Sequence, residues 1–141
     1  MKTLYLIGSL RNSEIPRLGQ EIRKLGIDVF DDWFSAGPEA DDHWKEYETK
    51  RDHTYKKALQ GWAARHVFDF DITHLDRCDG ACLVLPAGRS GHLELGYMAG
   101  AGKAVFVLLD DPDRWDVMYQ FAKDGVFFSQ EEMIEGLRSW R

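Results

Sequence analysis

The chain has 141 residues, of which 44% are hydrophobic and 30% are charged, and its formal net charge is -6. This length and balance predict one globular domain over residues 1–141, with enough apolar material for a core. The acidic balance excludes broad binding to a nucleic acid polymer, although a local basic spot could still hold one phosphate.

Along the first half of the chain, apolar residues follow strand and helix periods in turn. Gly26 and the Gly37–Pro38 pair mark breaks between segments. The expected elements are a strand at Thr3–Ile7, a helix from its cap Ser13 to about Lys24, a strand at Ile27–Phe30, a polar stretch at Ser35–Asp42 and a long helix at His43–Ala64.

The second half continues this alternation, and its apolar run at Ala81–Leu85 is typical of a central parallel strand. Ser129 followed by Glu132 predicts a capping box at the start of the last helix. The other expected elements are a helix at Phe68–Arg77, a turn at Pro86–Gly91, a helix at His92–Ala101, a strand at Ala104–Leu109, a helix at Asp113–Ala122 and a strand at Val126–Phe128.

Strands that alternate with helices in this way predict an α/β fold. We expect a single-domain flavodoxin-like or Rossmann-like three-layer sandwich with a mainly parallel five-stranded sheet. Ligands of such sheets bind beyond the carboxyl ends of the strands, near the switch in strand order. The segments at 8–11, 31–33 and 88–94 are therefore the candidates for facing a ligand.

Cys78 and Cys82 are the two cysteines of the chain. They are too few for a disulfide framework and lack the spacing of a zinc site, so we expect free, partly buried thiols and no metal or cofactor. The apolar run at the start is too short for a signal peptide, and no stretch is long enough to span a membrane. These features predict a cytoplasmic protein without a membrane partner.

Glu94 is the strongest candidate for chemistry. It follows a small-residue turn, Gly88 to Gly91, where backbone N–H groups can hold an anion. We expect Glu94 in the first turn of a helix, where the helix dipole keeps a carboxylate ionised. An ionised carboxylate can attack an anomeric carbon and form a covalent sugar ester. Alternatively, Glu94 could simply cap its helix.

Trp33 and Asp32 follow the second expected strand and are candidates for binding a base. Trp33 could stack on the base, a contact worth roughly 1–3 kcal/mol, and Asp32 could accept a hydrogen bond from it. Alternatively, this loop could pack locally against the helix that follows. Trp44, Tyr47, Tyr55 and Trp62 have near-helical spacing, which indicates a packing or oligomer face rather than a cofactor site.

One stretch resembles a known family. Gly91–Ala99, followed by Gly102 and Lys103, resembles the signature of the nucleoside 2-deoxyribosyltransferase family, whose superfamily includes nucleoside 5′-monophosphate N-glycosidases. Tyr5–Arg11, with Gly8 and Ser9, resembles the family's first strand and turn, and Asp71 resembles its helix aspartate.

The resemblance implies a role for each of three residues. Glu94 would be the nucleophile, Asp71 would position or protonate the substrate, and the Tyr5 hydroxyl would approach the nucleophile and the sugar. Each has an alternative, since Tyr5 could be a half-buried strand aromatic and Asp71 part of a solvated helix face.

The sequence departs from this pattern at Gly88. Relatives that hydrolyse nucleotides often have a serine there, six residues before the nucleophile, which binds the 5′-phosphate. Ser90, Arg89 and backbone N–H groups could replace it. His92 resembles a histidine of the cytidylate-hydrolase branch and could contact a phosphate or ribose, or cap the helix.

We therefore expect an enzyme that cleaves or exchanges the N-glycosidic bond of a (deoxy)nucleoside or nucleoside 5′-monophosphate through a covalent glycosyl-Glu94 intermediate. Transfer to another base and hydrolysis by water both remain open. The alternatives are a nucleotide-binding sensor without chemistry and a hydrolase of a larger nucleotide such as NAD. The resemblance implies a homo-oligomer, for which the aromatics of 43–62 and the segment around Trp115, Met118 and Tyr119 are candidate contacts.

Overall fold

Five parallel strands form the centre of the computed structural model, which describes residues 1–141. Their order across the sheet is β2-β1-β3-β4-β5. The order reverses between β1 and β3, so the loops that leave these two strands diverge at one edge. The predicted fold class is confirmed. The strands are β1 Thr3–Ile7, β2 Asp28–Phe30, β3 Gly80–Val84, β4 Ala104–Leu108 and β5 Gly125–Phe127.

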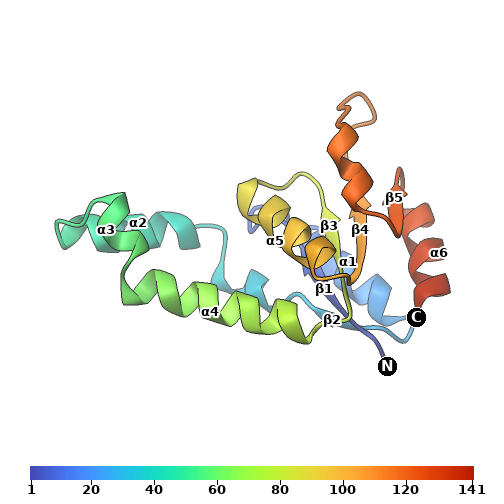
Figure 1. Ribbon diagram of the computed structural model, residues 1–141, viewed down its shortest axis with the longest axis horizontal. Helices are drawn as coiled ribbons and strands as arrows, with labels where there is room; N and C mark the ends of the chain where they lie inside the picture. Colours follow the sequence, from blue (N-terminus) through green and yellow to red (C-terminus); the bar gives the residue numbers. More distant parts are fainter.

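Helices cover both faces of this sheet (Figure 1). α1 and α6 pack on one face, while α5 and the C-terminal part of α4 pack on the other. None of the helices is both long and apolar enough to cross a membrane. The helices are α1 Ile15–Arg23, α2 Ala40–Lys50, α3 Tyr55–Leu59, α4 Trp62–Arg77, α5 Arg89–Gly100 and α6 Gln130–Trp140, with short 3₁₀ helices η1 Asp32–Ala36 and η2 Val117–Phe121.

The alternation of side chains along β1 decides which residues face the α4–α5 layer. Leu4 and Leu6 lie in the core beneath α1 and α6, whereas Tyr5 and Ile7 lie in the core beneath α4 and α5. Successive strand residues point to opposite faces, so the Tyr5 hydroxyl is directed toward the two helices. This orientation brings a polar group into an otherwise apolar layer.

α2, α3 and the N-terminal half of α4 form an arm that projects away from the sheet (Figure 1). The prediction of one helix at His43–Ala64 is wrong, because the chain breaks twice there. Asp52 has a positive φ of 59°, which ends α2. Thr54 then caps α3 by accepting a hydrogen bond from the Lys57 N–H at 3.2 Å, and Gly61 precedes α4.

Three other local predictions have mixed outcomes. The Ser129 capping box is confirmed, since its Oγ accepts from the Glu132 N–H at 3.2 Å. Ser13 does not cap α1, because Asn12 Oδ1 instead accepts from the Glu14 N–H at 3.1 Å. The helix predicted at 113–122 shortens to η2, whose residues are all at least partly exposed and so provide no buried face that would stabilise a longer helix.

Cys78 and Cys82 are buried free thiols.

Candidate active site

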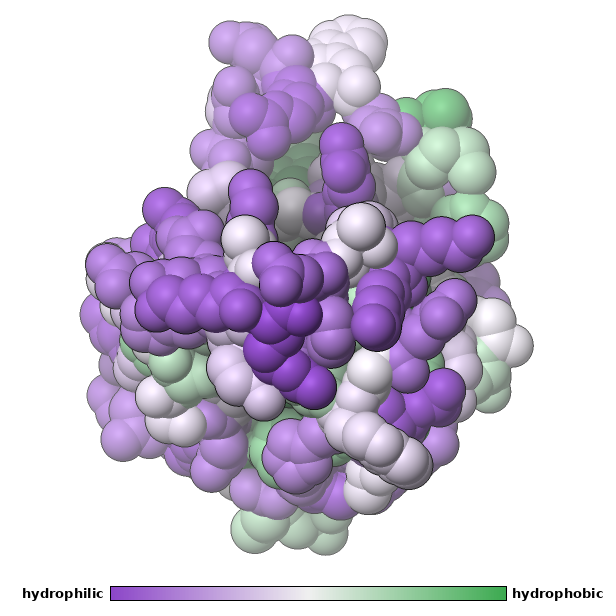
Figure 2. Space-filling view, turned by 90° about the vertical axis from the view of Figure 1, so that its left-hand side faces the viewer, coloured by the Kyte–Doolittle hydropathy of each residue, from purple (hydrophilic) through white to green (hydrophobic).

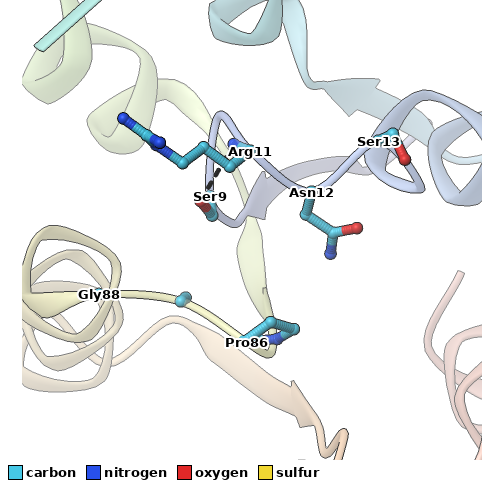
Figure 3. Close-up of a pocket in the computed structure, with 7 residues that line it drawn as sticks. Ser9, Arg11, Asn12, Ser13, Pro86 and Gly88 are labelled. Carbon is cyan, nitrogen blue, oxygen red and sulfur yellow. Dashed lines mark hydrogen bonds between the residues drawn. The ribbon is translucent and has the colours of Figure 1, made fainter. Parts of the chain in front are cut away.

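The loops after β1 and β3 face each other across a pocket of about 400 Å³ at the carboxyl edge of the sheet (Figure 3). Ser9 and Gly88, both predicted, lie on its two sides. Asn12 and Ser13 were not predicted as site residues, because their signal is only their position after the first strand. The lining residues are Ser9, Arg11, Asn12, Ser13, Pro86, Ala87 and Gly88.

Arg11 is the only cationic residue among those that line this pocket. Its Nη2 pairs with Asp42 Oδ2 of α2 at 3.1 Å, and both side chains are about two-thirds exposed at 69% and 67%. In Figure 3 the guanidinium extends away from Pro86, whereas the Asn12 amide points into the space between the loops. The pocket therefore offers several hydrogen-bond donors, and its one positive charge is paired with Asp42.

Gly8 and Trp33 form a packed wall beside the pocket. A Cβ on Gly8 would lie 2.5 Å from Ile15 Cδ1, so a side chain here would require the buried Ile15 to shift. Trp33 is half-buried, and its Nε1 donates to the Leu6 carbonyl at 2.8 Å. The indole is thus held against β1, with its edge near Gly8.

Asp31 and Asp32 have different environments. Arg23 holds the Asp31 carboxylate with two hydrogen bonds, of 2.6 and 3.2 Å. Asp32 is exposed at the start of η1. Of these two carboxylates, Asp32 is the one free to meet a ligand.

α5 begins at Arg89 rather than at His92, so Glu94 lies in its second turn. The added first turn packs closely on the sheet. Gly91 is buried, and a Cβ there would approach Ile7 and Leu83 to 3.1 Å, so this glycine serves close packing of the helix on the sheet. The prediction of Glu94 in the first turn is wrong. Because the dipole effect falls off beyond the first turn, it does little to ionise Glu94.

The Glu94 carboxylate is largely withdrawn from water. Its Oε2 is buried and has no hydrogen-bond partner. Burial is the main cause that raises the pKa of Glu94 to about 7, the charge of Asp71 adds to it, and the Tyr5 hydroxyl opposes it. The expectation that the helix dipole keeps Glu94 ionised is corrected, because with a pKa of about 7 its protonated and ionised forms coexist near neutral pH.

Tyr5 and Asp71 approach Glu94 from β1 and α4. Tyr5 is buried at 2% exposure, and burial together with the charges of Glu94 and Asp71 raises its pKa, so its hydroxyl stays protonated. Asp71 is half-buried, and burial raises the pKa of its carboxyl as well. The structure thus brings the three predicted residues together, with Tyr5 fully buried and Asp71 directed partly inward.

The first turns of α5 carry the remaining candidates, which are all exposed. His92 Nδ1 donates to the Gly88 carbonyl at 2.8 Å, which leaves Nε2 to accept from the Tyr119 hydroxyl at 3.0 Å. Arg89 and Ser90 make no side-chain hydrogen bond within the chain. No group of three His, Cys, Asp or Glu side chains is arranged to hold a metal ion.

No family model and no curated protein matches this chain. Several solved structures share its fold, among them the following three. A conserved protein from Enterococcus faecalis V583 aligns with a TM-score of 0.68 at 15% identity, covering 100% of this chain and 99% of the other. The CMP N-glycosidase BcmB of Clostridium botulinum aligns at 0.59 and 13% identity, covering 96% and 98%. A 2-deoxyribosyltransferase of Bacillus psychrosaccharolyticus aligns at 0.62 and 18% identity, covering 94% and 90%.

Proposed function

We propose that the protein cleaves or exchanges the N-glycosidic bond of a (deoxy)nucleoside or nucleoside 5′-monophosphate, with Glu94 as the nucleophile. The observation that carries this proposal is the buried, unpartnered Oε2 of Glu94 beside Asp71 and Tyr5. A buried acceptor without a partner is costly in a fold, and a substrate that uses it provides a reason for its retention. The activities named for two structures of the same fold support this class of substrate.

The two carboxyl groups divide the chemistry between them. Glu94, in its ionised form, attacks the anomeric carbon, and the C–N bond breaks with its electron pair moving to the base. Asp71, whose burial raises its pKa, is the candidate that donates a proton to the leaving base; a group near Asp32 is the other. Attack by a second base or by water on the sugar ester then releases Glu94.

Tyr5 supports the nucleophile. Its buried hydroxyl stays protonated and favours the ionised form of Glu94. When Glu94 bonds to the sugar, that hydroxyl becomes free to meet the sugar oxygens nearby. Tyr5 therefore helps to keep the buried Glu94 carboxylate ionised, which is the form that reacts.

The pocket between the β1 and β3 loops supports a 5′-phosphate on the substrate. Arg11 supplies a positive charge, and Ser9, Asn12 and Ser13 supply donors on the side opposite Gly88. Charge-assisted hydrogen bonds of this kind are the strong ones for phosphate. These donors, together with the exposed Arg89 and Ser90, would take the place of the phosphate-binding serine that this chain lacks at Gly88.

A panel assay tests the proposal. The protein is incubated with deoxynucleosides, ribonucleosides, their 5′-monophosphates and NAD, with and without a second free base, and released or exchanged base is measured. We expect turnover with at least one of the first three classes, and a loss of at least 10³-fold in Glu94→Ala, on the order expected for removal of a nucleophile.

Three readouts separate the alternatives. Intact-mass analysis should detect a glycosyl adduct in the wild type and not in Glu94→Gln. Turnover of NAD alone favours the hydrolase of a larger nucleotide. Tight nucleotide binding that survives in Glu94→Gln, with no base release from any substrate, would favour a sensor and contradict the enzyme proposal.

We further propose that a second copy of this chain covers the arm. Along α3 and α4 the arm leaves Tyr55, Leu59 and Trp62 exposed at 71%, 56% and 88%. Figure 2, which views the molecule from this side, shows a largely hydrophilic tip. Large apolar side chains left exposed on a projecting arm are typical of an interface between subunits.

A further inference from the structure

The helix that carries Asp71 contacts the sheet through a small apolar face, in which Phe70 and His74 pack against Phe30 of β2. α4 has 16 residues, and Leu75 is the only one that is fully buried. The N-terminal half of α4 belongs to the projecting arm (Figure 1). The position of Asp71 over the sheet therefore depends on how the last turns of α4 are held.

Lys103 holds the C-terminal end of α4. Its Nζ donates to the carbonyls of Leu75 at 3.0 Å and of Cys78 at 2.8 Å, and also to the carbonyl of Asp76. These carbonyls lie where a helix runs out of its own donors, and the negative end of the helix dipole favours a cation there. An ammonium group has three donors, so all of them are used.

Lys103 reaches this place because of a turn after α5. Gly102 has a φ of +77°, a conformation that favours glycine, and it directs the chain from α5 into β4. Lys103 follows that turn and is half-buried. The contacts of the Lys103 ammonium group with these three carbonyls, called the clamp below, therefore join the end of α5 to the end of α4.

Tyr97 makes a second tie between the same helices. Its hydroxyl, on α5, donates to Asp76 Oδ1 at 2.5 Å. Tyr97 lies about one turn beyond Glu94, and the clamped Leu75 lies about one turn beyond Asp71. Each of the two carboxyl-bearing residues is thus about one turn from a contact that joins α4 to α5.

We propose that Lys103, assisted by Tyr97, is a positioning residue that sets the separation between the carboxyl groups of Asp71 and Glu94. When the carboxyl groups of Asp71 and Glu94 are both ionised in this poorly solvated layer, they repel each other, and the repulsion favours movement of α4 away from α5. The clamp opposes this movement at the end of α4 nearest the sheet. This inference rests on the proposed function only in giving Glu94 a catalytic role.

The pKa of Glu94 reports on its separation from Asp71, because few charged or polar groups influence that pKa. Asp71 on α4 raises its pKa, and Tyr5 on β1 lowers it. If the clamp is lost and α4 moves outward, the contribution of Asp71 declines and water reaches the carboxyl. Both changes lower the pKa of Glu94.

The test is a ¹³C NMR titration of glutamate side-chain carboxyls, with the Glu94 signal assigned from Glu94→Gln. We expect Lys103→Met to lower the pKa of Glu94 by about half a pH unit or more. Lys103→Arg, which can still donate to the carbonyls, should restore most of the wild-type value. Lys123→Met removes an exposed lysine away from α4 and should change nothing.

A folded Lys103→Met protein with an unchanged Glu94 pKa would overturn the inference. If Lys103→Met does not fold, Tyr97→Phe provides the test, because it removes only one partly exposed hydroxyl. This variant must also lower the pKa of Glu94. The titration requires no substrate, so a protein that is inactive on every substrate but shows these shifts would contradict the proposed function and support the positioning role. Where turnover is measurable, the acid limb of the pH–rate profile must move with the NMR value.

Discussion

At the scale of single residues, the site combines groups that make folding less favourable. Glu94 has a buried oxygen without a partner, and a second carboxyl lies close to it. Tyr5 is buried in a core of apolar side chains. Costs of this kind are concentrated at functional sites, where a ligand or a reaction uses the groups that the fold leaves unsatisfied.

Glu94→Gln should stabilise the protein at alkaline pH. The pKa of Glu94 is raised in the folded state to about 7, above its unfolded value, so the folded state binds more protons between these two values. The free energy of unfolding therefore falls as pH rises through this window, and the loss is complete above pH 7. At pH 8 we expect Glu94→Gln to gain roughly 1–3 kcal/mol relative to wild type.

Urea denaturation at pH 4 and pH 8 checks this expectation. At pH 4, where Glu94 is protonated in the folded state and mostly protonated in the unfolded state, the variant and wild type should differ little. Glu131→Gln serves as a control on an exposed glutamate. An equal stability difference at the two pH values would contradict the burial of Glu94.

Arg11 and Asp42 should have opposite effects on the binding of a 5′-phosphate. Arg11→Gln removes the positive charge of the pocket and should weaken binding of a nucleoside 5′-monophosphate about tenfold. Asp42→Asn releases Arg11 from its ion pair and should strengthen binding about twofold to threefold, as expected for an exposed pair.

Calorimetry in the Glu94→Gln background measures this without turnover. The nucleoside that lacks the phosphate is the matched control, because neither substitution should change its affinity. If both variants affect the nucleoside and the monophosphate equally, the pocket does not bind the phosphate.

At the scale of elements, caps and turns decide where the helices begin and end. The last helix shows this well: Ser129 Oγ accepts from the Glu132 N–H, and the Glu132 carboxylate accepts from the Phe128 N–H at 2.7 Å. In the arm, buried Glu48 binds His53 Nδ1 at 2.7 Å across the turn that separates α2 from α3. Short polar contacts thus shape segments that have little core of their own.

Ser129→Ala should cost about 1 kcal/mol in the free energy of unfolding, because the Glu132 N–H loses its acceptor. The midpoint of chemical denaturation measures the change. Ser139→Ala, an exposed serine in the last turn of the same helix, is the control and should be close to neutral. Equal effects of the two substitutions would show that the cap contributes nothing.

At the scale of the whole molecule, the arm is the feature that one chain does not explain. Its helices lie beyond the sheet, and an isolated helix of such length is marginal in water without packing on one face. A second copy would supply that face.

Trp62→Glu should convert an oligomer into a monomer, because it puts a charge on the most exposed aromatic of the arm. Light scattering after gel filtration measures the mass, and circular dichroism shows whether the fold is kept. Phe128→Glu changes another exposed aromatic, next to β5, and should leave the mass unchanged. A wild-type protein that is monomeric at all concentrations would exclude the interface.

Local sequence was sufficient to predict the sheet and the edge that bears the site. Continuous apolar runs such as Ala81–Leu85 need only their own composition to be recognised as buried strands, and the β-α alternation then implies parallel strands with loops at one edge. The Ser129 capping box was predictable because both partners lie within three residues. Candidate site residues such as Ser9 and Gly88 followed from their places after strands.

Long-range packing decided what local pattern did not. α5 begins at Arg89, and Gly91 lets this helix pack closely against β1 and β3. The breaks of the arm at Asp52 and Gly61, in contrast, are local turns that the helical pattern did not reveal. The protonation of Glu94 is also a tertiary property. Its pKa depends on burial and on Asp71, a residue 23 positions earlier that only the packing of α4 beside α5 brings near. Sequence therefore identified the carboxylate, whereas the surrounding fold determined its charge.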